Sequence, residues 1–229
     1  MKAYHKIPIA DCAEPLVPIP LDLFAVVSPH PYQNLGAPYG ERSPFYLRQG
    51  VLNSLIAAQT QLQKERPGWQ IQIFDAYRPI SVQEFMVKYS YKQLLRAEGL
   101  REEDLSEAQQ QAILDRVYQF WALPSSDPKT PPPHSTGAAI DVTLLDSMGE
   151  PVDMGSPIDE ISPRSYPDRF ANSANLSERD YHTSRELLRS AMHSAGFERH
   201  LKEWWHFSQG DQMWAWLTNQ KTARYGRVN

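Results

Sequence analysis

The segment Ala139–Leu145 constrains the fold more than any other part of the sequence, because apolar and polar residues alternate through its middle. Side chains of a β-strand point alternately to the two faces of a sheet. The pattern therefore predicts a strand with one buried apolar face and with the carboxylate of Asp141 on the opposite face. A loop dense in proline, residues 124–133, precedes this segment and leads to His134.

Three further stretches have apolar residues at the spacing typical of helices. They cover residues 46–66, residues 81–122 as two helices separated near Gly99, and a stretch that begins near Thr183 and stops at Gly196. Two pairs with capping-box spacing support helix starts: Ser106 with Gln109, and Thr183 with Glu186.

Two more segments predict strands. Residues 69–77 alternate between apolar and polar side chains, and residues 203–207 are rich in aromatic residues, which favour strands. Loop-like stretches cover residues 1–43 and 146–175. The order of elements predicts an α+β fold with a small antiparallel or mixed sheet flanked by helices, and we expect one domain over residues 1–229.

Composition narrows the class of protein. The 229 residues are 41% hydrophobic and 22% charged, which is typical of a globular chain with one sizeable core. A formal net charge of -4 and the lack of a basic stripe argue against nucleic-acid binding. The N-terminus lacks an apolar signal-peptide core, and no stretch approaches the ~20 apolar residues of a membrane span.

Cysteine content bears on the compartment. Cys12 is the only cysteine, so no disulfide can form within the chain. Together with the lack of a signal peptide, this leads us to expect a cytoplasmic protein and an inert thiol. The expected partner is a small molecule or another protein, and the sequence leaves the oligomeric state open.

Two segments together carry the residues of a catalytic metal site. His134 and Asp141 lie in one, and Glu203 and His206 lie in the other. Two histidines and a carboxylate as ligands, with a second carboxylate as general base, match a catalytic zinc site that keeps one coordination position open. Glu203 and His206 would point to opposite faces of a regular strand, so this interpretation requires a bulge or a bend between them.

Each role has a residue of suitable chemistry. Glu203, if it is not a ligand, can accept a proton from an activated water and pass it to a leaving amine. The guanidinium of Arg78 can donate charged hydrogen bonds to the oxyanion that forms at a scissile carbonyl. Both roles belong to hydrolysis of a peptide bond.

Simpler explanations exist for each residue alone. His134 would then be a surface residue beside a loop, and His206 a core histidine held by a hydrogen bond. Asp141 would be a charge at a strand edge, and Arg78 would pair with Asp75 at a turn. The joint presence of the residues favours the metal site, because together they form a complete one.

Three motifs in this order resemble a known family. Residues 75–79 (DAYRP), 134–141 (HSTGAAID) and 203–206 (EWWH) are similar to the D-Ala-D-Ala dipeptidases of the VanX type. These zinc peptidases share a fold with D-Ala-D-Ala carboxypeptidases and the Hedgehog N-terminal domain. The resemblance runs from about residue 20 to residue 210 and includes a turn at residues 154–156.

The resemblance implies one zinc ion per chain and hydrolysis of a small dipeptide, D-Ala-D-Ala, to two D-Ala. A carboxylate that holds the free amino group of the substrate would restrict the enzyme to dipeptides. The simpler alternative for that carboxylate is a solvated loop residue. The implied site consists of the zinc ligands His134, Asp141 and His206, the general base Glu203, the oxyanion-stabilising Arg78 and the amine-binding Asp159.

The chain departs from some relatives at residues 131–133, where three prolines replace serines before His134. A contact from a serine hydroxyl to substrate is lost there, which leaves the specificity open. The alternatives are a D,D-carboxypeptidase or other cell-wall peptidase of the same fold, and a zinc-binding module without catalysis. The tail after Asn219 has no role that the sequence reveals. The remaining histidines are expected to be structural or at the surface: His5, His30, His182, His193 and His200.

Overall fold

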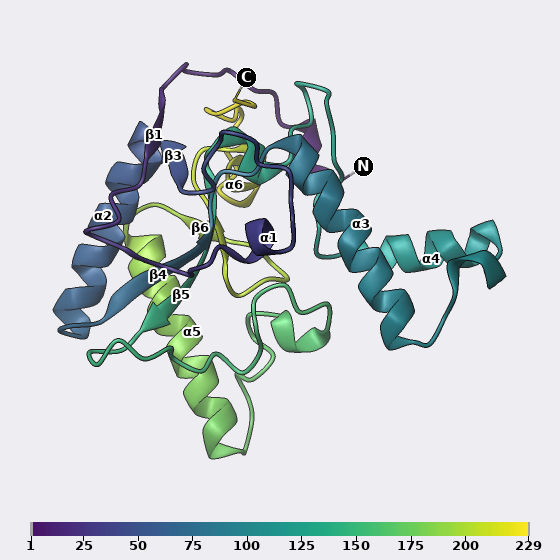
Figure 1. Cartoon of the computed structure of the whole chain (residues 1–229). Coiled ribbons are helices and arrows are strands. Elements are labelled where there is room, and N and C mark those ends of the chain that lie inside the picture. Colours follow the sequence, from purple (N-terminus) through teal and green to yellow (C-terminus); the bar gives the residue numbers. More distant parts are fainter. Residues whose placement is uncertain (1, 229) are drawn as a thin grey trace.

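A five-stranded mixed sheet runs through the middle of the molecule (Figure 1). This computed structural model describes residues 2–228. The strand order is β2-β4-β5-β7-β6, with a parallel β2–β4 pair and antiparallel pairs elsewhere, while β1 and β3 form a separate antiparallel pair. The predicted α+β fold with a small mixed sheet is confirmed. The strands are β1 (Leu16–Pro18), β2 (Ala25–Val26), β3 (Tyr46–Arg48), β4 (Gln70–Asp75), β5 (Ala139–Leu145), β6 (Glu198–Arg199) and β7 (His206–Ser208).

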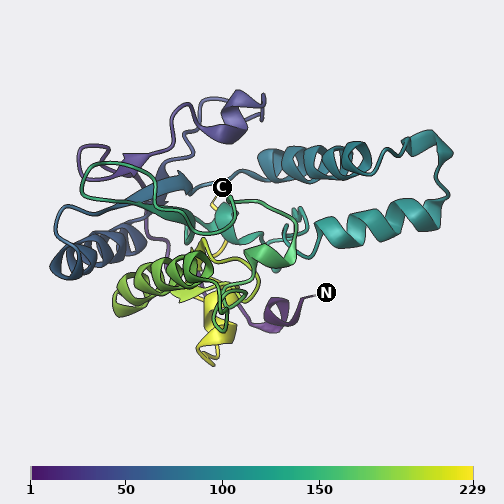
Figure 2. The ribbon, with the colours of Figure 1, turned by 90° about the horizontal axis from the view of Figure 1, so that it is seen from below.

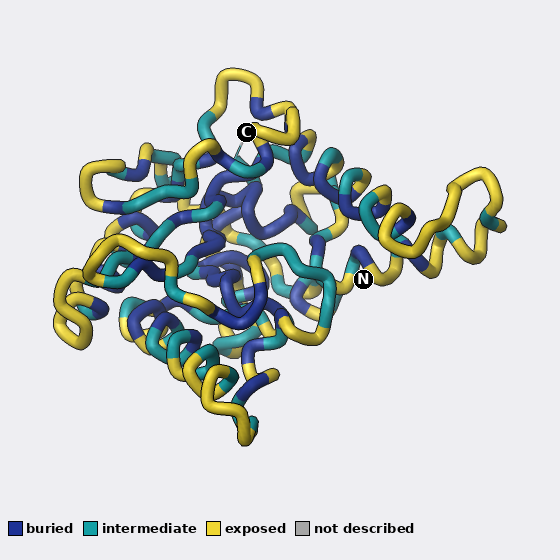
Figure 3. The backbone as a smooth tube through the Cα atoms, turned by 60° about the horizontal axis from the view of Figure 1, so that its bottom comes forward, coloured by how far each residue is buried: buried dark blue, intermediate teal, exposed yellow. Residues whose placement is uncertain are grey.

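Helices α2 and α5 lie side by side and cover one face of this sheet (Figure 2). Helices α3 and α4 form a pair that extends away from the sheet, and the connection between them is exposed (Figure 3). The helices are α1 (Pro31–Asn34), α2 (Gln49–Glu65), α3 (Ile80–Ala97), α4 (Glu107–Val117), α5 (Leu176–Ser194) and α6 (Gln212–Leu217), with short 3-10 helices η1 (Ala3–Lys6), η2 (Glu102–Asp104), η3 (Pro133–Thr136) and η4 (Pro163–Ser165).

The central strand β5 has the bounds that the alternation predicts. Its residues Ile140, Val142 and Leu144 are completely buried in the same hydrophobic cluster as the inner sides of α2 and α5. Burying a side chain of this size stabilises the fold by roughly 1.5–3 kcal/mol. Asp141 therefore lies on the face of the sheet that these helices leave uncovered.

A second hydrophobic cluster joins the α3–α4 pair to the segment around α1. It contains Val82 and Met86 of α3, Val117 of α4, and the aromatic residues Tyr32 and Trp121. Tyr32 and Trp121 also lie against the guanidinium of Arg78, at the uncovered face of the sheet. The second cluster thus meets the sheet at the candidate site.

Two predicted helix starts are wrong. Residues 46–48 form β3, because they pair with β1, and α2 begins only at Gln49. Helix α5 begins at Leu176, where the side chain of Asn175 accepts hydrogen bonds from the first-turn amides. Thr183 lies inside this helix, and its hydroxyl donates to the carbonyl of Arg179.

The start of α4 and the ends of α3 and α5 agree with the sequence predictions. The capping box of Ser106 and Gln109 begins α4. Helix α3 ends at Ala97, two residues before Gly99. Gly196 follows the end of α5 with φ of 92°, a left-handed conformation that glycine adopts without strain.

The long loop 146–175 is fixed to the body by Arg185 of α5. This arginine is completely buried, and its guanidinium donates to the carbonyls of Met154, Arg164 and Tyr166 and to the hydroxyl of Ser156. A charged donor bonded to several backbone carbonyls holds a loop more firmly than neutral contacts do. Helix α5 therefore positions the segment before Asp159, although this helix covers the opposite face of the sheet.

The C-terminal tail has a structural role that the sequence did not reveal. Ala223 pairs with Ile9 near the N-terminus, and the amide of Val228 donates to the carbonyl of Ser135. The tail therefore supports the loop that carries His134. Among residues 2–228, none of the helices combines the length and the apolar character that crossing a bilayer requires.

Candidate active site

Three polar side chains lie in one row across the central strands. The register places Asp75 opposite Asp141, and Asp141 opposite His206. Directly opposite residues share a face of the sheet. Asp75 reaches this face because β4 shifts register between Ile73 and Asp75; in a regular strand it would follow Ile71 and Ile73 into the core.

Glu203 belongs to a bend before β7, so the strand predicted over residues 203–207 is wrong at its start. The aromatic run suggested a strand, but Trp204 and Trp205 are instead buried in an irregular segment of the core. The bend lets Glu203 and His206 line the same pocket despite their odd separation. The change of direction that the metal interpretation required is thus present.

His134 reaches the row from η3, which immediately precedes β5. Gly137 ends this turn with φ of 69°, in the left-handed region. A Cβ at this position would lie 2.5 Å from Cδ1 of Leu16, so the side chain of Leu16 would have to shift to admit another residue. Gly137 therefore allows the chain to place His134 and Asp141 on the same side of the sheet.

His134, Asp141 and His206 form a buried cluster that fits a divalent cation. Nε2 of His134 lies 3.1 Å from Nδ1 of His206 and 3.2 Å from Oδ2 of Asp141, and Nδ1 of His206 lies 3.1 Å from Oδ1 of Asp141. Ligand atoms of a tetrahedral zinc site lie about 3.3 Å apart, given metal–ligand distances of ~2.0–2.1 Å. The three side chains therefore have the spacing of a ligand set.

The protonation of the cluster also fits metal binding. Nδ1 of His134 lies 2.6 Å from the carbonyl of Ala76, which can only accept, so Nδ1 carries the proton and Nε2 faces the cluster. Nε2 of His206 lies 3.3 Å from the hydroxyl of Ser208. Burial lowers the pKa of His206 to about 4, which keeps the ring neutral. Burial alone would raise the pKa of Asp141, but the adjacent histidines outweigh it and hold the pKa well below its usual value.

Glu203 lies beside the cluster without joining it. One of its oxygens is 3.9 Å from Nδ1 of His206, and the other is 3.3 Å from Nδ1 of His200. Burial, followed by the charge of Asp141, raises the pKa of Glu203 well above its usual value. A buried carboxyl group with a raised pKa can exchange protons near neutral pH.

Arg78 connects the row of carboxylates. Its Nε donates to Asp75 at 2.8 Å and its Nη2 to Asp141 at 3.1 Å and to the hydroxyl of Tyr32 at 3.2 Å. Nη1 donates to Gln83 at 3.0 Å, and within residues 2–228 its other N–H has no bonding partner. Arg78 thus pairs with Asp75, as the simpler explanation expected, and it also lines the pocket with one N–H unbonded among the described residues.

Asp159 lies on the wall of the same pocket and is half-buried. The hydroxyl of Tyr32 donates to its Oδ2 at 2.7 Å. Burial, followed by the charge of Asp141, raises the pKa of Asp159 to about 7. Because Tyr32 also accepts from Arg78, a chain of hydrogen bonds connects the charged centre to Asp159.

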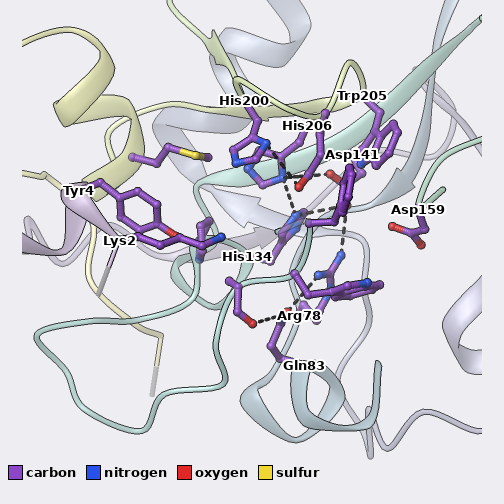
Figure 4. A pocket seen from close by; sticks show the side chains of 16 residues that line it. Lys2, Tyr4, Arg78, Gln83, His134, Asp141, Asp159, His200, Trp205 and His206 are labelled. Carbon is purple, nitrogen blue, oxygen red and sulfur yellow. Dashed lines mark hydrogen bonds and ion pairs between the residues drawn. The ribbon is translucent and has the colours of Figure 1, made fainter. Parts of the chain in front are cut away.

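Figure 4 shows how the pocket surrounds this cluster. All six residues predicted for the site line it, so the structure brings them together. His200, expected to be structural or at the surface, also lines the pocket, three residues before Glu203. The sequence also missed lining residues from distant segments: Lys2, Tyr4, Gln83 and Trp121.

A second group of metal-ligand residue types, Asp168, His182 and Glu186, lies at the surface. Glu186 already pairs with Arg189 and Arg199. The charge of this carboxylate is therefore compensated without an ion, and the buried cluster remains the candidate metal centre.

The fold and the site together indicate a hydrolytic enzyme, and comparison with known proteins gives its family. The family model described as D-ala-D-ala dipeptidase, of the peptidase M15 group, matches residues 26–225. The chain therefore belongs to this family of metallopeptidases and is a peptidase.

Curated relatives agree with this assignment. A D-alanyl-D-alanine dipeptidase of a Synechocystis species is 50% identical over 240 aligned residues, which span 100% of this chain and 97% of the relative. The enzyme of the same name from Enterococcus faecium is 43% identical over 34% of this chain and 37% of its own length. The one from Escherichia coli is 31% identical over 61% of this chain and 55% of its own length.

Proposed function

We propose that the chain hydrolyses D-Ala-D-Ala to two molecules of D-Ala, with zinc held by His134, Asp141 and His206. The observation that carries this proposal is the buried cluster of these three residues, with Glu203 and Arg78 beside it. The full-length similarity to a D-alanyl-D-alanine dipeptidase supports the substrate. Both hydrophobic clusters contribute walls to this one site, which supports a single domain.

The ligand set determines the chemistry that zinc would supply. Bound by two neutral imidazoles and one carboxylate, zinc keeps a positive charge, lowers the pKa of water toward ~7 and polarises a carbonyl. Glu203 accepts the proton of the attacking water and returns it to the leaving amine of the second residue. Nδ1 of His200 accepts from the amide of Lys202, and the ring packs beside the carboxyl group of Glu203, with Nδ1 3.3 Å from Oε1.

Arg78 stabilises negative charge on the oxygen of the scissile carbonyl. The contacts with Asp75, Gln83 and Tyr32 fix the guanidinium before substrate arrives. A donor that is already in position costs no reorganisation when the charge develops. The N–H of Nη1 that is not bonded to Gln83 is the donor suited to this role.

Asp159 binds the free amino group of the substrate, supported by the hydroxyl of Tyr32. A peptide extended or blocked at its amino end lacks an ammonium at this position, and it would cover the half-buried carboxylate without pairing it. Removing a charge from water without a partner is costly, so the site discriminates strongly against such substrates. This property distinguishes a dipeptidase from a carboxypeptidase of the same family that acts on longer peptides.

The test compares free D-Ala-D-Ala with its N-acetylated form on the purified chain. We expect release of D-Ala from the free dipeptide and a kcat/KM lower by at least ~100-fold for the blocked one. Equal cleavage of both would contradict the amine-binding role of Asp159 and favour a D,D-carboxypeptidase.

A further inference from the structure

The N-terminal segment supplies one wall of the pocket. Lys2, the residue before η1, and Tyr4, within η1, line the pocket together with the candidate metal ligands. Tyr4 is buried and η1 packs against α6, which fixes this segment to the body. The side chain of Lys2 points into the pocket (Figure 4).

Lys2 differs from the other cation of the pocket in its partners. Arg78 is bonded to Asp75 and Asp141, so its charge is compensated within the protein. Within residues 2–228, no hydrogen bond or ion pair engages the ammonium of Lys2. Burial lowers the pKa of Lys2 below its usual value. The charge of Glu203 opposes this shift, but the two groups form no ion pair among the described residues, so the partly desolvated ammonium still gains from an anion that enters the pocket.

The two charged groups of the pocket that form no ion pair among the described residues, Asp159 and Lys2, lie on opposite sides of the candidate metal centre. Figure 4 places Asp159 on one side of the His134–Asp141–His206 cluster and Lys2 on the other. A dipeptide at neutral pH carries an ammonium on one side of its peptide bond and a carboxylate on the other. With its ammonium at Asp159 and its peptide bond at the cluster, the carboxylate lies toward Lys2.

The loop before His134 offers no alternative donor for that carboxylate. Residues 131–133 are prolines, which have neither a hydroxyl nor an N–H. The hydroxyls that follow are turned into the backbone, because Ser135 donates to the carbonyl of Pro132 and Thr136 to that of Pro133. Tyr4 and His200 offer only neutral donors on this side of the pocket, so Lys2 is the charged donor there.

We propose that Lys2 binds the C-terminal carboxylate of the substrate and so selects peptides that end directly after the scissile bond. This assignment rests on the proposed dipeptidase function and adds the second half of its specificity. Asp159 would bind the ammonium at the amino end of the dipeptide, and Lys2 would bind the carboxylate at its carboxyl end. The two contacts together would limit the length of the substrate. A substrate with an amidated or extended C-terminus would lose the ion pair.

The experiment measures kcat/KM of the native chain and of Lys2→Met on D-Ala-D-Ala and on D-Ala-D-Ala amide. The matched control is Lys6→Met, because Lys6 lies at the end of the short helix that follows Lys2 but is exposed and lines no part of the pocket. We expect Lys2→Met to lower kcat/KM on the free acid by roughly 10- to 100-fold, the size of a charged hydrogen bond. The amide should be affected little, so that the preference for the acid collapses, and Lys2→Arg should restore part of it.

Several outcomes would overturn the assignment. Equal losses on acid and amide would mean that Lys2 acts on the reaction through Glu203, and losses no larger than those of Lys6→Met would mean that it contributes nothing. A failure of the proposed function looks different, because the native chain itself would then leave D-Ala-D-Ala uncleaved. Melting temperatures of all variants show whether a loss reflects unfolding.

Discussion

The centre of the pocket and its two ends are built in different ways. Asp141 and His206 are fixed by the register of neighbouring strands, and both are buried. Asp159 and Lys2 come from a long loop and an N-terminal 3-10 helix, and both are partly exposed. The reaction chemistry therefore rests on the sheet, whereas the selection of substrate rests on segments attached to it. Substitutions at the centre should affect turnover, and those at the ends should affect the choice of substrate.

The largest effect is expected for Glu203→Gln, which tests whether the centre separates metal binding from catalysis. The amide cannot accept a proton, so kcat should fall by roughly 10²- to 10⁴-fold. Zinc content, measured by atomic spectroscopy, should stay at one per chain, because Glu203 is not in the ligand cluster. Glu198→Gln, a change of the same type outside the pocket, should leave both quantities unchanged. Loss of zinc from Glu203→Gln would make Glu203 a ligand.

The next largest effect is expected for Arg78→Ala. Loss of a donor to the oxyanion should lower kcat/KM by roughly 10²- to 10³-fold. Asp75 and Asp141 would lose their buried cation, and breaking such a pair costs about 3–5 kcal/mol of folding stability. Kinetics and denaturant unfolding of this variant and of Arg78→Lys separate the two effects. A kcat/KM that recovers fully in Arg78→Lys would show that charge suffices and the fork is unnecessary.

A smaller effect concerns the pH dependence of KM at the amine-binding end. Asp159 has a pKa of about 7, so it is ionised above this pH and becomes neutral below it. Binding of the substrate ammonium is therefore retained at pH 8 and lost as the pH falls, and KM should rise about tenfold between pH 8 and pH 6. In Asp159→Asn, KM should be high and nearly independent of pH. A native KM that is constant over this range would contradict the role of Asp159.

The smallest effect is expected on folding stability, and it tests whether the candidate metal centre depends on the tight turn at Gly137. Gly137 and Gly149 both have positive φ, but only Gly137 lacks space for a Cβ. Gly149→Ala should cost about 1–2 kcal/mol for the backbone alone. Gly137→Ala should cost about 1 kcal/mol more, because the side chain of Leu16 must shift, and should also weaken zinc binding. Thermal unfolding with and without zinc measures both the loss of stability and the loss of zinc binding. Equal melting temperatures of the two glycine variants would show that the turn at Gly137 is not tightly constrained.

Local patterns predicted the parts of the fold that local physics decides. The alternation in β5 gave its bounds, and Ser106 with Gln109 gave the start of α4. The prediction failed for α5, because its cap, Asn175, lies in a polar loop where many residues have capping chemistry. It failed for the start of β7, because aromatic residues are also typical of buried irregular segments.

The site was predictable where its residues lie in motifs and unpredictable where tertiary structure assembles it. His134, Asp141, Glu203 and His206 lie in two short segments, so their chemistry could be recognised together. Lys2 reaches the same pocket from the other end of the chain, and nothing in its sequence surroundings marks it. The bulge that turns Asp75 toward the site likewise depends on pairing with β5.

Release of D-Ala from D-Ala-D-Ala, before and after removal of metal, tests the central claim most directly. The purified chain should release D-Ala, lose this activity on chelation and regain it when one zinc per chain is returned. His206→Ala should fold but fail to regain activity, because it lacks one member of the cluster. Activity that survives complete removal of metal, or a native chain with one zinc bound that leaves the dipeptide intact, would contradict the proposed function.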